Sequence, residues 1–507
     1  MEQIILNVMS QPEWKYPIFS YYFVMFLIIS IIPSNLKLST QLQTYINASN
    51  AKSNDDIMAR TIIQKYISTP KNIRQGTITN YNIAVIPPSG VQINSPGTYF
   101  LSNNINFNAA ITPSGVTICA IVINSSNVVL NLQGYQITQT NASNLDSVGI
   151  YITSNLSNVQ VINGSMSGFG SYTITSFNSS NITIIKMKVS NQRCADVSFA
   201  SAGIFIVGGT NVIISNSSVS NANVQSLSYA GIQLRFCMNS KIISSLVKNC
   251  VNNAGGCSGI SALASKNIVF SDNEVSGINS GTILPKMSPG HTTLGIFLFL
   301  SSYVSVSNCN INNVHGSCDD SHAVSVFVCS SDIIVKNCDI YNITSGFATG
   351  TGAKATGVEI IMSYNTKIQD CVVKKVKVLK PQDLQCAGFS SSCALNTEFH
   401  NCLAEDIVTT GINTKGVGFG WAPDPRQTFI QPTFNAKFVK CYAKNVDVGF
   451  DMFYSIAGNI INCKTNNAKV DVLDIKESRT LTCNECSECN PSTSSIIPNI
   501  GRDNIIL

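Results

Sequence analysis

The sequence carries little charge for its length. Charged residues make up 12% of the 507 residues, and the formal net charge is +5. So weak a balance gives no sign of a nucleic-acid partner. The one basic run, residues 374–380, alternates with apolar residues and has no aromatic stacking partners. It therefore favours a solvated strand edge or loop over a nucleic-acid site.

The sequence also lacks, near its N-terminus, an apolar run of the usual membrane-spanning length. Residues 18–32 form an uninterrupted apolar run of 15 residues, whereas a transmembrane helix needs roughly 20. The run suits a cleaved signal peptide or an uncleaved signal-anchor. Both remain open, because acidic residues precede it and no A-x-A cleavage site follows. A buried core helix is the third alternative. Either of the first two would place the chain on the extracellular side, secreted or anchored at a cell or virion surface.

The 18 cysteines include no paired CxxC motifs, which argues against a zinc module. The cluster at residues 483–489 has three cysteines and leaves a zinc site one ligand short, so disulfides or a redox-exposed tail are the better interpretations. Two pairs that flank loops are candidates for disulfides: Cys250 with Cys257, and Cys386 with Cys393. We predict no metal and no cofactor.

What the sequence does contain is a repeat. Residues 332–340 show the frame N-Φ-x-Φ-x-N-C, in which Φ is apolar and Asp replaces the first Asn. About twelve copies follow one another, starting at residues 127, 158, 181, 211, 239, 267, 303, 332, 365, 396, 435 and 457. The copy near 239 is shifted by one residue, which predicts a bulge. A period this regular predicts stacked structural units.

A second pattern, Gly-Φ-x-Φ, lies upstream of most copies. Clear examples start at Gly149, Gly203, Gly231, Gly259, Gly295 and Gly357. Each repeat therefore holds two alternating strands, a corner and a third arm of variable length. Gly and Asn at the corners allow the left-handed backbone of tight turns. Strands this short stack on their equivalents in the next repeat, about 4.8 Å away, as parallel sheets.

The two patterns together resemble those of the pectate-lyase-like β-helix superfamily. The resemblance implies an all-β protein, a right-handed parallel β-helix of about 12 coils. It says little about activity, because members with unrelated activities share these patterns. We divide the chain into a signal peptide or signal-anchor (1–33), a polar linker with an N-terminal helical cap (34–82), the β-helix (83–470) and a Cys-containing tail (471–507).

Two frame positions predict columns of stacked side chains. The sixth is Asn, Asp or Lys in most copies, and stacked amides hydrogen-bond along the axis. The seventh is Cys in six copies: Cys309, Cys338, Cys371, Cys402, Cys441 and Cys463. Coil spacing lies within the range of disulfide Cα separations, but parallel side chains fit disulfide geometry poorly. We favour a column of reduced, buried thiols over disulfides and over a metal column.

Superfamily enzymes that cleave polysaccharides place carboxylates together on one sheet face. Here the outward positions of the Gly-Φ-x-Φ strands hold two acidic residues, Glu359 and Asp451, three coils or about 14 Å apart. Compared with the polygalacturonase-like family, the chain has one Asp319-Asp320 pair with His322 nearby, but lacks the Asn-x-Asp, Gly-His-Gly and Arg-x-Lys motifs. These three residues are the candidates for catalysis, although a solvated turn is the simpler interpretation.

An insertion between Gly418 and Asn435 adds Trp421, Asp424 and Arg426, the composition of a sugar-binding loop. A Pro-stiffened loop that packs its Trp over the coil is the structural alternative. Sequons fit an extracellular chain, although several arise by chance in so Asn-rich a sequence. The glycosylation candidates are Asn47, Asn124, Asn141, Asn155, Asn178, Asn181 and Asn342.

Three functions follow, in order of preference. The first is a non-enzymatic, secreted or membrane-anchored surface protein with a glycan-binding, adhesive or structural role. The second is a polysaccharide lyase or glycoside hydrolase with a diverged site. The third is a fibre or tail-spike component that forms a homotrimer. The first leads because the sheet face is predicted to be small, polar and without a charge constellation. The expected partner is a polysaccharide or cell-surface glycan, with the membrane as a second partner if residues 18–32 stay uncleaved.

Overall fold

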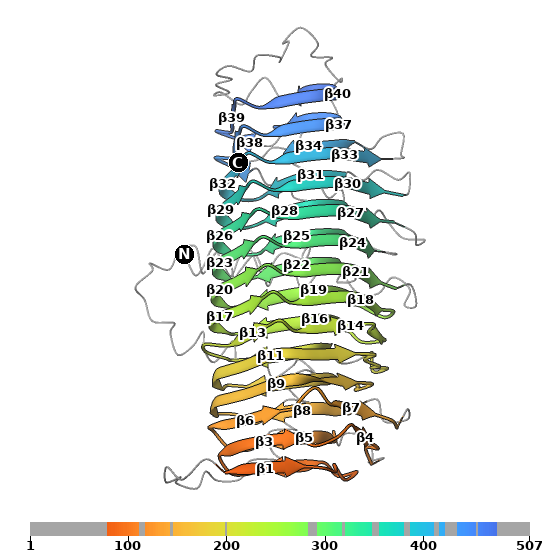
Figure 1. Cartoon of the computed structure of the whole chain (residues 1–507). Coiled ribbons are helices and arrows are strands. Elements are labelled where there is room, and N and C mark those ends of the chain that lie inside the picture. Colours follow the sequence, from red (N-terminus) through yellow and green to blue (C-terminus); the bar gives the residue numbers. More distant parts are fainter. Residues whose placement is uncertain are drawn as a thin grey trace, which may run out of the picture.

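The computed structural model describes residues 79–473, with gaps at 111–116, 142–145, 198–199, 282–291, 317–319, 347–353, 380–385, 410–414, 421–432 and 453–454. Within this part every named element is a strand and no helix is present. The strands stack coil upon coil into one elongated column, with the N-terminal strands at one end and the C-terminal strands at the other (Figure 1). The predicted signal segment, helical cap and Cys-containing tail end lie outside the described residues.

The strands form three ladders, in which each strand pairs in parallel with its equivalent in the next coil. The first sheet contains the Gly-Φ-x-Φ strands: β2 (Val91–Ile93), β5 (Cys119–Ile123), β8 (Val148–Ile152), β10 (Tyr172–Phe177), β12 (Ala200–Val207), β16 (Ser228–Arg235), β19 (Gly256–Leu263), β22 (Thr293–Phe299), β25 (Ser321–Phe327), β28 (Ala355–Ile361), β31 (Cys386–Ser392) and β34 (Gly416–Gly420).

The second sheet contains the strands of the Asn frame: β1 (Asn80–Ile83), β3 (Gly97–Leu101), β6 (Val128–Asn131), β13 (Ile213–Ser215), β17 (Met238–Ile243), β20 (Lys266–Ser271), β23 (Ser302–Ser307), β26 (Ser331–Lys336), β29 (Tyr364–Gln369), β32 (Leu395–His400), β35 (Thr433–Phe434), β36 (Lys437–Val439), β38 (Ser455–Ile456) and β39 (Asn459–Ile461).

The third sheet follows the second corner: β4 (Ile105–Phe107), β7 (Gln136–Gln139), β14 (Ser218–Ser220), β15 (Asn223–Val224), β18 (Leu246–Asn252), β21 (Glu274–Ser280), β24 (Asn310–Gly316), β27 (Asp339–Ser345), β30 (Val372–Val378) and β33 (Leu403–Thr409). Four longer strands turn a corner unbroken and belong to two sheets: β9 (Ser157–Ser167), β11 (Ser180–Ser190), β37 (Tyr442–Asp451) and β40 (Lys464–Leu473).

The register of the strands follows the sequence repeat. Equivalent frame positions pair in consecutive coils, as in Val304 with Ile333 and Ile333 with Thr366. The predicted parallel β-helix is therefore confirmed. The predicted bulge near residue 239 is wrong, because Ser240 pairs with Ile268 in the ordinary register. That copy keeps the frame and simply has Ser at an apolar position.

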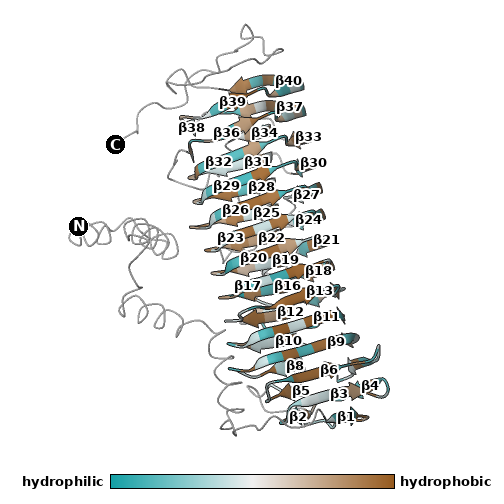
Figure 2. Cartoon of the chain, turned by 60° about the vertical axis from the view of Figure 1, so that its left-hand side comes forward, coloured by the Kyte–Doolittle hydropathy of each residue, from teal (hydrophilic) through white to brown (hydrophobic). Residues whose placement is uncertain are grey.

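The inward-facing side chains form one continuous core from Ile83 to Cys463. Figure 2 shows hydrophobic and hydrophilic residues alternating along the strands in coil after coil. Ile and Val fill most coils, because β-branched side chains pack well on a pleated surface. Near the C-terminal end phenylalanines take over. Phe389, Phe419 and Phe450 stack with ring centroids 4.8 and 5.2 Å apart, close to the strand spacing.

The glycine of Gly-Φ-x-Φ is required by space. A Cβ on Gly231 would lie 2.4 Å from Val247 Cγ1 and 2.8 Å from the carbonyl oxygen of Gly259. The chain bends at this residue and the strand register resumes on either side of it. The six glycines of the clear examples are absent from the positive-φ residues, so the expectation of a left-handed backbone at this position is wrong.

Asparagine does take the left-handed conformation, with φ of 52° at Asn365 and 51° at Asn337. Amides at the first frame position hydrogen-bond along the axis, Asn396 to Asn365 at 3.1 Å and Asn435 to Asn396 at 3.0 Å. The sixth position does the same where the residues allow it, as in Asn337 to Asn308 at 3.3 Å. A third column, five residues further on, was missed from the sequence; it includes Asn313, Asn342, Asn445 and Asn467.

Candidate functional site

Four ionisable residues meet on the outward face of the first sheet, at β25 and β28. Lys354 Nζ donates to Glu359 Oε1 at 2.5 Å, and His322 Nε2 lies 3.1 Å from Glu359 Oε2. The backbone N–H of Lys354 donates to Asp320 Oδ1 at 2.8 Å. We call Asp320, His322, Lys354 and Glu359 the Glu359 cluster. The carboxylate of Glu359 contacts Lys354 in its own coil and His322 in the preceding coil, so the cluster links two consecutive coils.

Three members of the Glu359 cluster are buried, with His322, Lys354 and Glu359 each 3% exposed, whereas Asp320 is partly exposed. From the sequence, this sheet face is expected to be small, polar and without a charge constellation. The last expectation is wrong, because Lys354, Glu359 and His322 meet there. Other outward residues of the face, such as Tyr151 and Ser390, are buried as well. Removing charged groups from water is costly unless they are paired and hydrogen-bonded, which explains why Lys354 and Glu359 are in direct contact.

Sequence reasoning found part of this cluster. The sequence offers three catalytic candidates, of which Asp320 and His322 belong to the cluster. The third, Asp319, lies outside the described residues. Lys354 was missed because it precedes β28 and belongs to neither repeat pattern. His322 has the position just before the bend of the first sheet, where side chains also face outward, in register with Thr356. If the position of His322 had been counted as outward-facing, the sequence would have predicted that His322 and Glu359 lie on the same face.

The residue types of the Glu359 cluster are those of general acid–base catalysis. The other acidic residue in the outward column of Glu359 is distant, however. Asp451 lies in the same column as Glu359, with Ser390 and Gly420 between them. Three strand spacings amount to about 14 Å, beyond the roughly 5–10 Å that paired glycosidase carboxylates need. Among the residues that the structure describes, no group of three His, Cys, Asp or Glu side chains could share a metal ion.

A second candidate site is a shallow depression of about 430 Å³ beside β11 and β15. We call it the Arg193 pocket; its lining is Asn191, Gln192, Arg193, Cys194, Ala195, Asn221, Asn223 and Gln225. Most of these side chains are exposed, whereas Gln192 and Cys194 are buried beneath them. Burial raises the pKa of Cys194 to about 11, so its thiol is neutral near pH 7. The pocket therefore presents amides and one guanidinium group over a neutral floor.

Hydrogen-bonding capacity remains in the Arg193 pocket. Arg193 Nη2 donates to the carbonyl oxygen of Gln139 at 3.4 Å, one of the five donors that a guanidinium has. Asn223 Oδ1 accepts from Asn253 at 2.8 Å, which orients its amide group. Amides offer both donors and acceptors for hydroxyl groups, and a guanidinium pairs with carboxylate or sulfate. This chemistry suits a sugar, either neutral or acidic.

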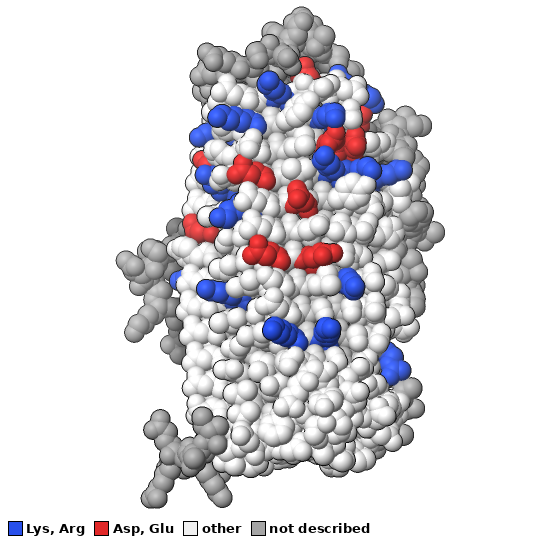
Figure 3. Space-filling view, viewed as in Figure 1, with Lys and Arg blue, Asp and Glu red and all other residues white. Residues whose placement is uncertain are grey.

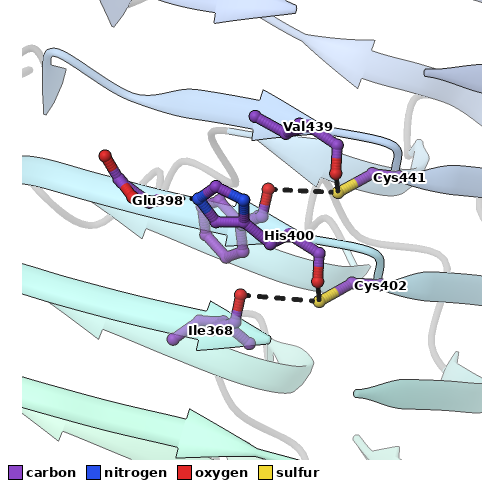
Figure 4. Close-up of polar contacts among 7 residues, drawn as sticks. Ile368, Glu398, His400, Cys402, Val439 and Cys441 are labelled. Carbon is purple, nitrogen blue, oxygen red and sulfur yellow. Dashed lines mark hydrogen bonds and ion pairs between the residues drawn. The ribbon is translucent and has the colours of Figure 1, made fainter. Parts of the chain in front are cut away.

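The six frame cysteines lie one per coil at the corner between the second and third sheets, and all are buried. Each thiol faces carbonyl oxygens of the backbone. Cys402 Sγ lies 3.2 Å from the oxygen of His400 and 3.8 Å from that of Ile368 in the preceding coil (Figure 4). Cys309, Cys338, Cys371, Cys402 and Cys441 carry free thiols. Burial is the largest cause that raises the pKa of Cys441 above its ordinary value.

Three of the four cysteines that the sequence suggests as disulfide partners are free thiols: Cys250, Cys257 and Cys386. Cys257 Sγ lies 3.6 Å from the backbone oxygen of Cys250, so it faces a carbonyl and not a sulfur. Cys386 is likewise a free thiol in the core.

The sequons differ in their surroundings. Asn155 and Asn178 are exposed at corners. Asn181 and Asn342 are also exposed, but their amides donate along the ladders, to Asn158 at 2.9 Å and Asn313 at 2.7 Å. The amides of Asn124 and Asn141 donate to Asn94 and to the carbonyl oxygen of Ala109, respectively. Modification at those four would replace an existing hydrogen bond.

Several predicted residues lie outside the described part of the chain: Trp421, Asp424, Arg426, Asn47, the cysteines at 483–489 and the apolar run 18–32. Among the residues that are described, no helix has the length and apolar character to cross a membrane.

A family model described as a right handed beta helix region matches residues 200–404. Together with the parallel register of all three sheets, this match shows that the chain is a right-handed parallel β-helix protein. No curated protein matches the sequence.

Solved structures with a similar fold come from several sources. The A-module of the Azotobacter vinelandii mannuronan C-5 epimerase AlgE6 is 11% identical, with 77% of this chain and 90% of that chain covered and a TM-score of 0.42. The tailspike protein of E. coli bacteriophage HK620, solved with a pentasaccharide, is 12% identical over 76% and 72%, with a TM-score of 0.45. PfbA, a surface adhesin of Streptococcus pneumoniae, is 10% identical over 74% and 85%, with a TM-score of 0.38. At these values none of them assigns an activity to this chain.

Proposed function

We propose that this protein is a non-enzymatic surface β-helix that binds a glycan through the Arg193 pocket. The observation that supports the proposal best is the lining of the pocket, in which exposed amides surround a guanidinium group. The exposed ladders support the same proposal, because neutral Asn amides hydrogen-bond along them from coil to coil. A rigid, polar and weakly charged scaffold is suited to binding neutral or mildly acidic carbohydrate at a cell or virion surface.

The pocket is tested by calorimetry with a panel of neutral and uronate-containing oligosaccharides. Loss of a hydrogen bond that involves a charged group costs about 1.5–3 kcal/mol, so Arg193→Ala should weaken binding roughly ten- to hundredfold. Arg235→Ala is the matched control, since Arg235 lies over the Phe236 ring and away from the pocket. Binding that survives Arg193→Ala unchanged, or that is equally lost with Arg235→Ala, would contradict the proposal.

A polysaccharide lyase or glycoside hydrolase is the second candidate, and the Glu359 cluster is the observation that favours it. A histidine and a lysine share one carboxylate there, which is suitable chemistry for proton transfer. Their 3% exposure makes the cluster a closed site in this structure. Degradation of any polysaccharide in the panel, abolished by His322→Gln but not by Arg193→Ala, would raise this candidate above the first.

The location and assembly of the chain remain predictions. Intact-mass measurement of the secreted protein, with and without reductant, reports cleavage near residue 33, glycosylation and disulfides together. A homotrimer would show directly in light scattering.

A further inference from the structure

A line of exposed apolar side chains runs along the corner between the first and second sheets. At the start of the second-sheet strands, Tyr364, Leu395 and Phe434 pair in register in three consecutive coils. Met238 has the same register position four coils before Tyr364, and Phe236 lies at the corner just before Met238. All five side chains are 36–49% exposed. We call them the apolar ridge.

The backbone along this corner is strained as well. Phe236, Leu300 and Met362 take the left-handed conformation, with φ of 55°, 50° and 49°. Bulky residues rarely adopt this conformation, whereas Asn tolerates it and has it at the next corner, as at Asn337. An Asn would therefore suit both the backbone and the contact with water better than an apolar residue does. Strained backbone that presents exposed apolar side chains indicates a function for those side chains.

Partly exposed rings at the ends of the first-sheet strands widen the ridge. Phe299 and Phe327 pair in register there, and their ring centroids are 6.1 Å apart. From Met238 on β17 to Phe434 on β35 there are six strand spacings, or about 29 Å. Single exposed apolar residues need no explanation, but a continuous apolar surface marks a site of contact with a protein or a membrane.

The charges on this corner indicate which partner it has. Among the described residues of these register columns, Arg235 and Lys266 carry charge, and both are basic. The guanidinium carbon of Arg235 lies 5.3 Å from the ring centroid of Phe236, and Lys266 Nζ lies 5.4 Å from that of Tyr303. Basic groups beside exposed apolar side chains suit the surface of a bilayer, where the apolar part enters the acyl boundary and the charge stays at anionic headgroups.

The shape of the ridge fits a bilayer too. Its residues lie on a convex corner, and the second-sheet strands follow one another in a straight line along one side of the column (Figure 1). A folded protein partner would need a groove of matching length, whereas a bilayer adapts to a convex surface.

We propose that the apolar ridge is a membrane-binding surface, with which the column lies lengthwise on a bilayer that contains anionic lipid. The contact involves no residue that lines the Arg193 pocket, so it does not depend on the glycan binding proposed above. It is also distinct from residues 18–32, because it is formed by the folded β-helix.

Vesicle flotation of the full chain tests the ridge with a matched pair of variants. Leu395→Thr/Phe434→Thr removes two ridge side chains of 45% and 43% exposure, and Tyr341→Thr/Val408→Thr removes two of 41% and 47% from the third sheet. With vesicles of phosphatidylcholine and phosphatidylserine, we expect the ridge variant to bind about tenfold more weakly than the wild type, and the control to bind as the wild type does.

The lipid charge is tested in the same assay. Attraction to an anionic surface contributes about 1 kcal/mol for each basic residue near it, so Lys266→Gln should weaken binding about fivefold. Vesicles of phosphatidylcholine alone should bind the wild type more weakly and show no effect of Lys266→Gln.

A fluorescence reporter distinguishes the ridge from residues 18–32. Tyr364→Trp places the reporter on the ridge, and Tyr341→Trp places it on the third sheet; the signal of the two native tryptophans is subtracted with the wild type. Lipids brominated in their acyl chains quench a tryptophan only at close range. We expect quenching of the reporter at position 364 and none at position 341.

Failure of either readout overturns the proposal. Binding that the ridge variant retains in full, or that leaves the reporter at position 364 unquenched, would assign the membrane contact to another segment, such as residues 18–32. A loss of binding shared by both double variants would overturn it too. A wild type that binds no vesicle does the same; a multimer that light scattering detects and that the ridge variant dissociates would then identify the ridge as a contact between copies of the chain.

Discussion

Two carboxylates in this protein are each held by two basic side chains, but in opposite environments. Glu359 contacts Lys354 and His322 on the first sheet, where all three are about 3% exposed. Glu405 contacts Lys374 at 2.9 Å and Lys444 at 2.6 Å on the third sheet. There the lysine side chains are 42% and 39% exposed, and the glutamate 15%. Figure 3 shows charged residues gathered over the C-terminal coils, while the N-terminal coils are almost free of them in this view.

The comparison shows that the same ion-pair chemistry has different consequences according to burial. Lys374, Glu405 and Lys444 lie in one register column of three consecutive coils, so their contacts follow from the repeat. Water screens them, and exposed pairs of this kind contribute little. The Glu359 cluster is desolvated, so removing one member leaves an uncompensated charge.

Glu359→Gln is expected to have the largest effect, a loss of about 3–5 kcal/mol in the free energy of unfolding. The substitution keeps the shape of the side chain but leaves the buried ammonium of Lys354 without its counter-charge. Urea unfolding followed by far-UV circular dichroism measures the loss. A loss below about 1 kcal/mol would mean that the cluster is solvated and behaves like Glu405.

The double variant Lys354→Met/Glu359→Leu should be more stable than either single variant. Buried ion pairs replaced by apolar residues of similar volume are often neutral or stabilising, by about 1–4 kcal/mol, because no charge remains to be desolvated. The same unfolding assay, arranged as a double-mutant cycle, gives the coupling energy. Additive single effects would show that the two residues do not act as a pair.

Glu405→Gln should reduce the free energy of unfolding by about 1 kcal/mol or less, because its partners are exposed. The effect should shrink further at about 1 M salt, where the screening length is about 3 Å. Glu359→Gln should keep most of its effect in the same buffer. Equal salt sensitivity of the two variants would remove the distinction between the two sites.

The smallest expected effect is the change with pH in the stability that Glu405 contributes. Hydrogen bonds from Lys444 and Lys374 lower the pKa of this carboxyl below its ordinary value. A group whose folded-state pKa is lowered stabilises the folded state above its unfolded-state pKa, and that stabilisation is lost as pH falls through the folded-state pKa. The stability difference between wild type and Glu405→Gln should therefore disappear in acid. A difference that grows with acidity would contradict the sign.

The fold could be predicted because each coil is specified by the same local sequence pattern. The frame that starts at Asp332 defines strand, corner and strand, and the same frame 33 residues later at Asn365 defines its partner. Parallel stacking in register follows, since alternation allows only one face of each strand to point inward. The Asn positions were informative because few residues tolerate a left-handed backbone, and Asn is one of them.

The two candidate sites, the Glu359 cluster and the Arg193 pocket, include residues outside the repeat patterns. The sequence therefore predicted them only in part. His322 and Asp320 were selected by their types, but Lys354 belongs to no pattern. The Arg193 pocket had no sequence signal, because its residues lie in β15 and in the chain that follows β11, β14 and β15, and look like ordinary polar corners. The glycines were found correctly but explained wrongly, since the clash that requires Gly231 involves Val247 on another sheet.

Local patterns in the sequence therefore specify the architecture: three parallel sheets, apolar residues inward, and Asn and Cys repeated at the corner positions. Periodic apolar spacing and tolerance of left-handed backbone are local properties, which act wherever the residues occur. The folded chain is needed to show which outward residues are buried and that Lys354 reaches Glu359. Burial depends on everything that packs around a side chain, and no local pattern contains that information.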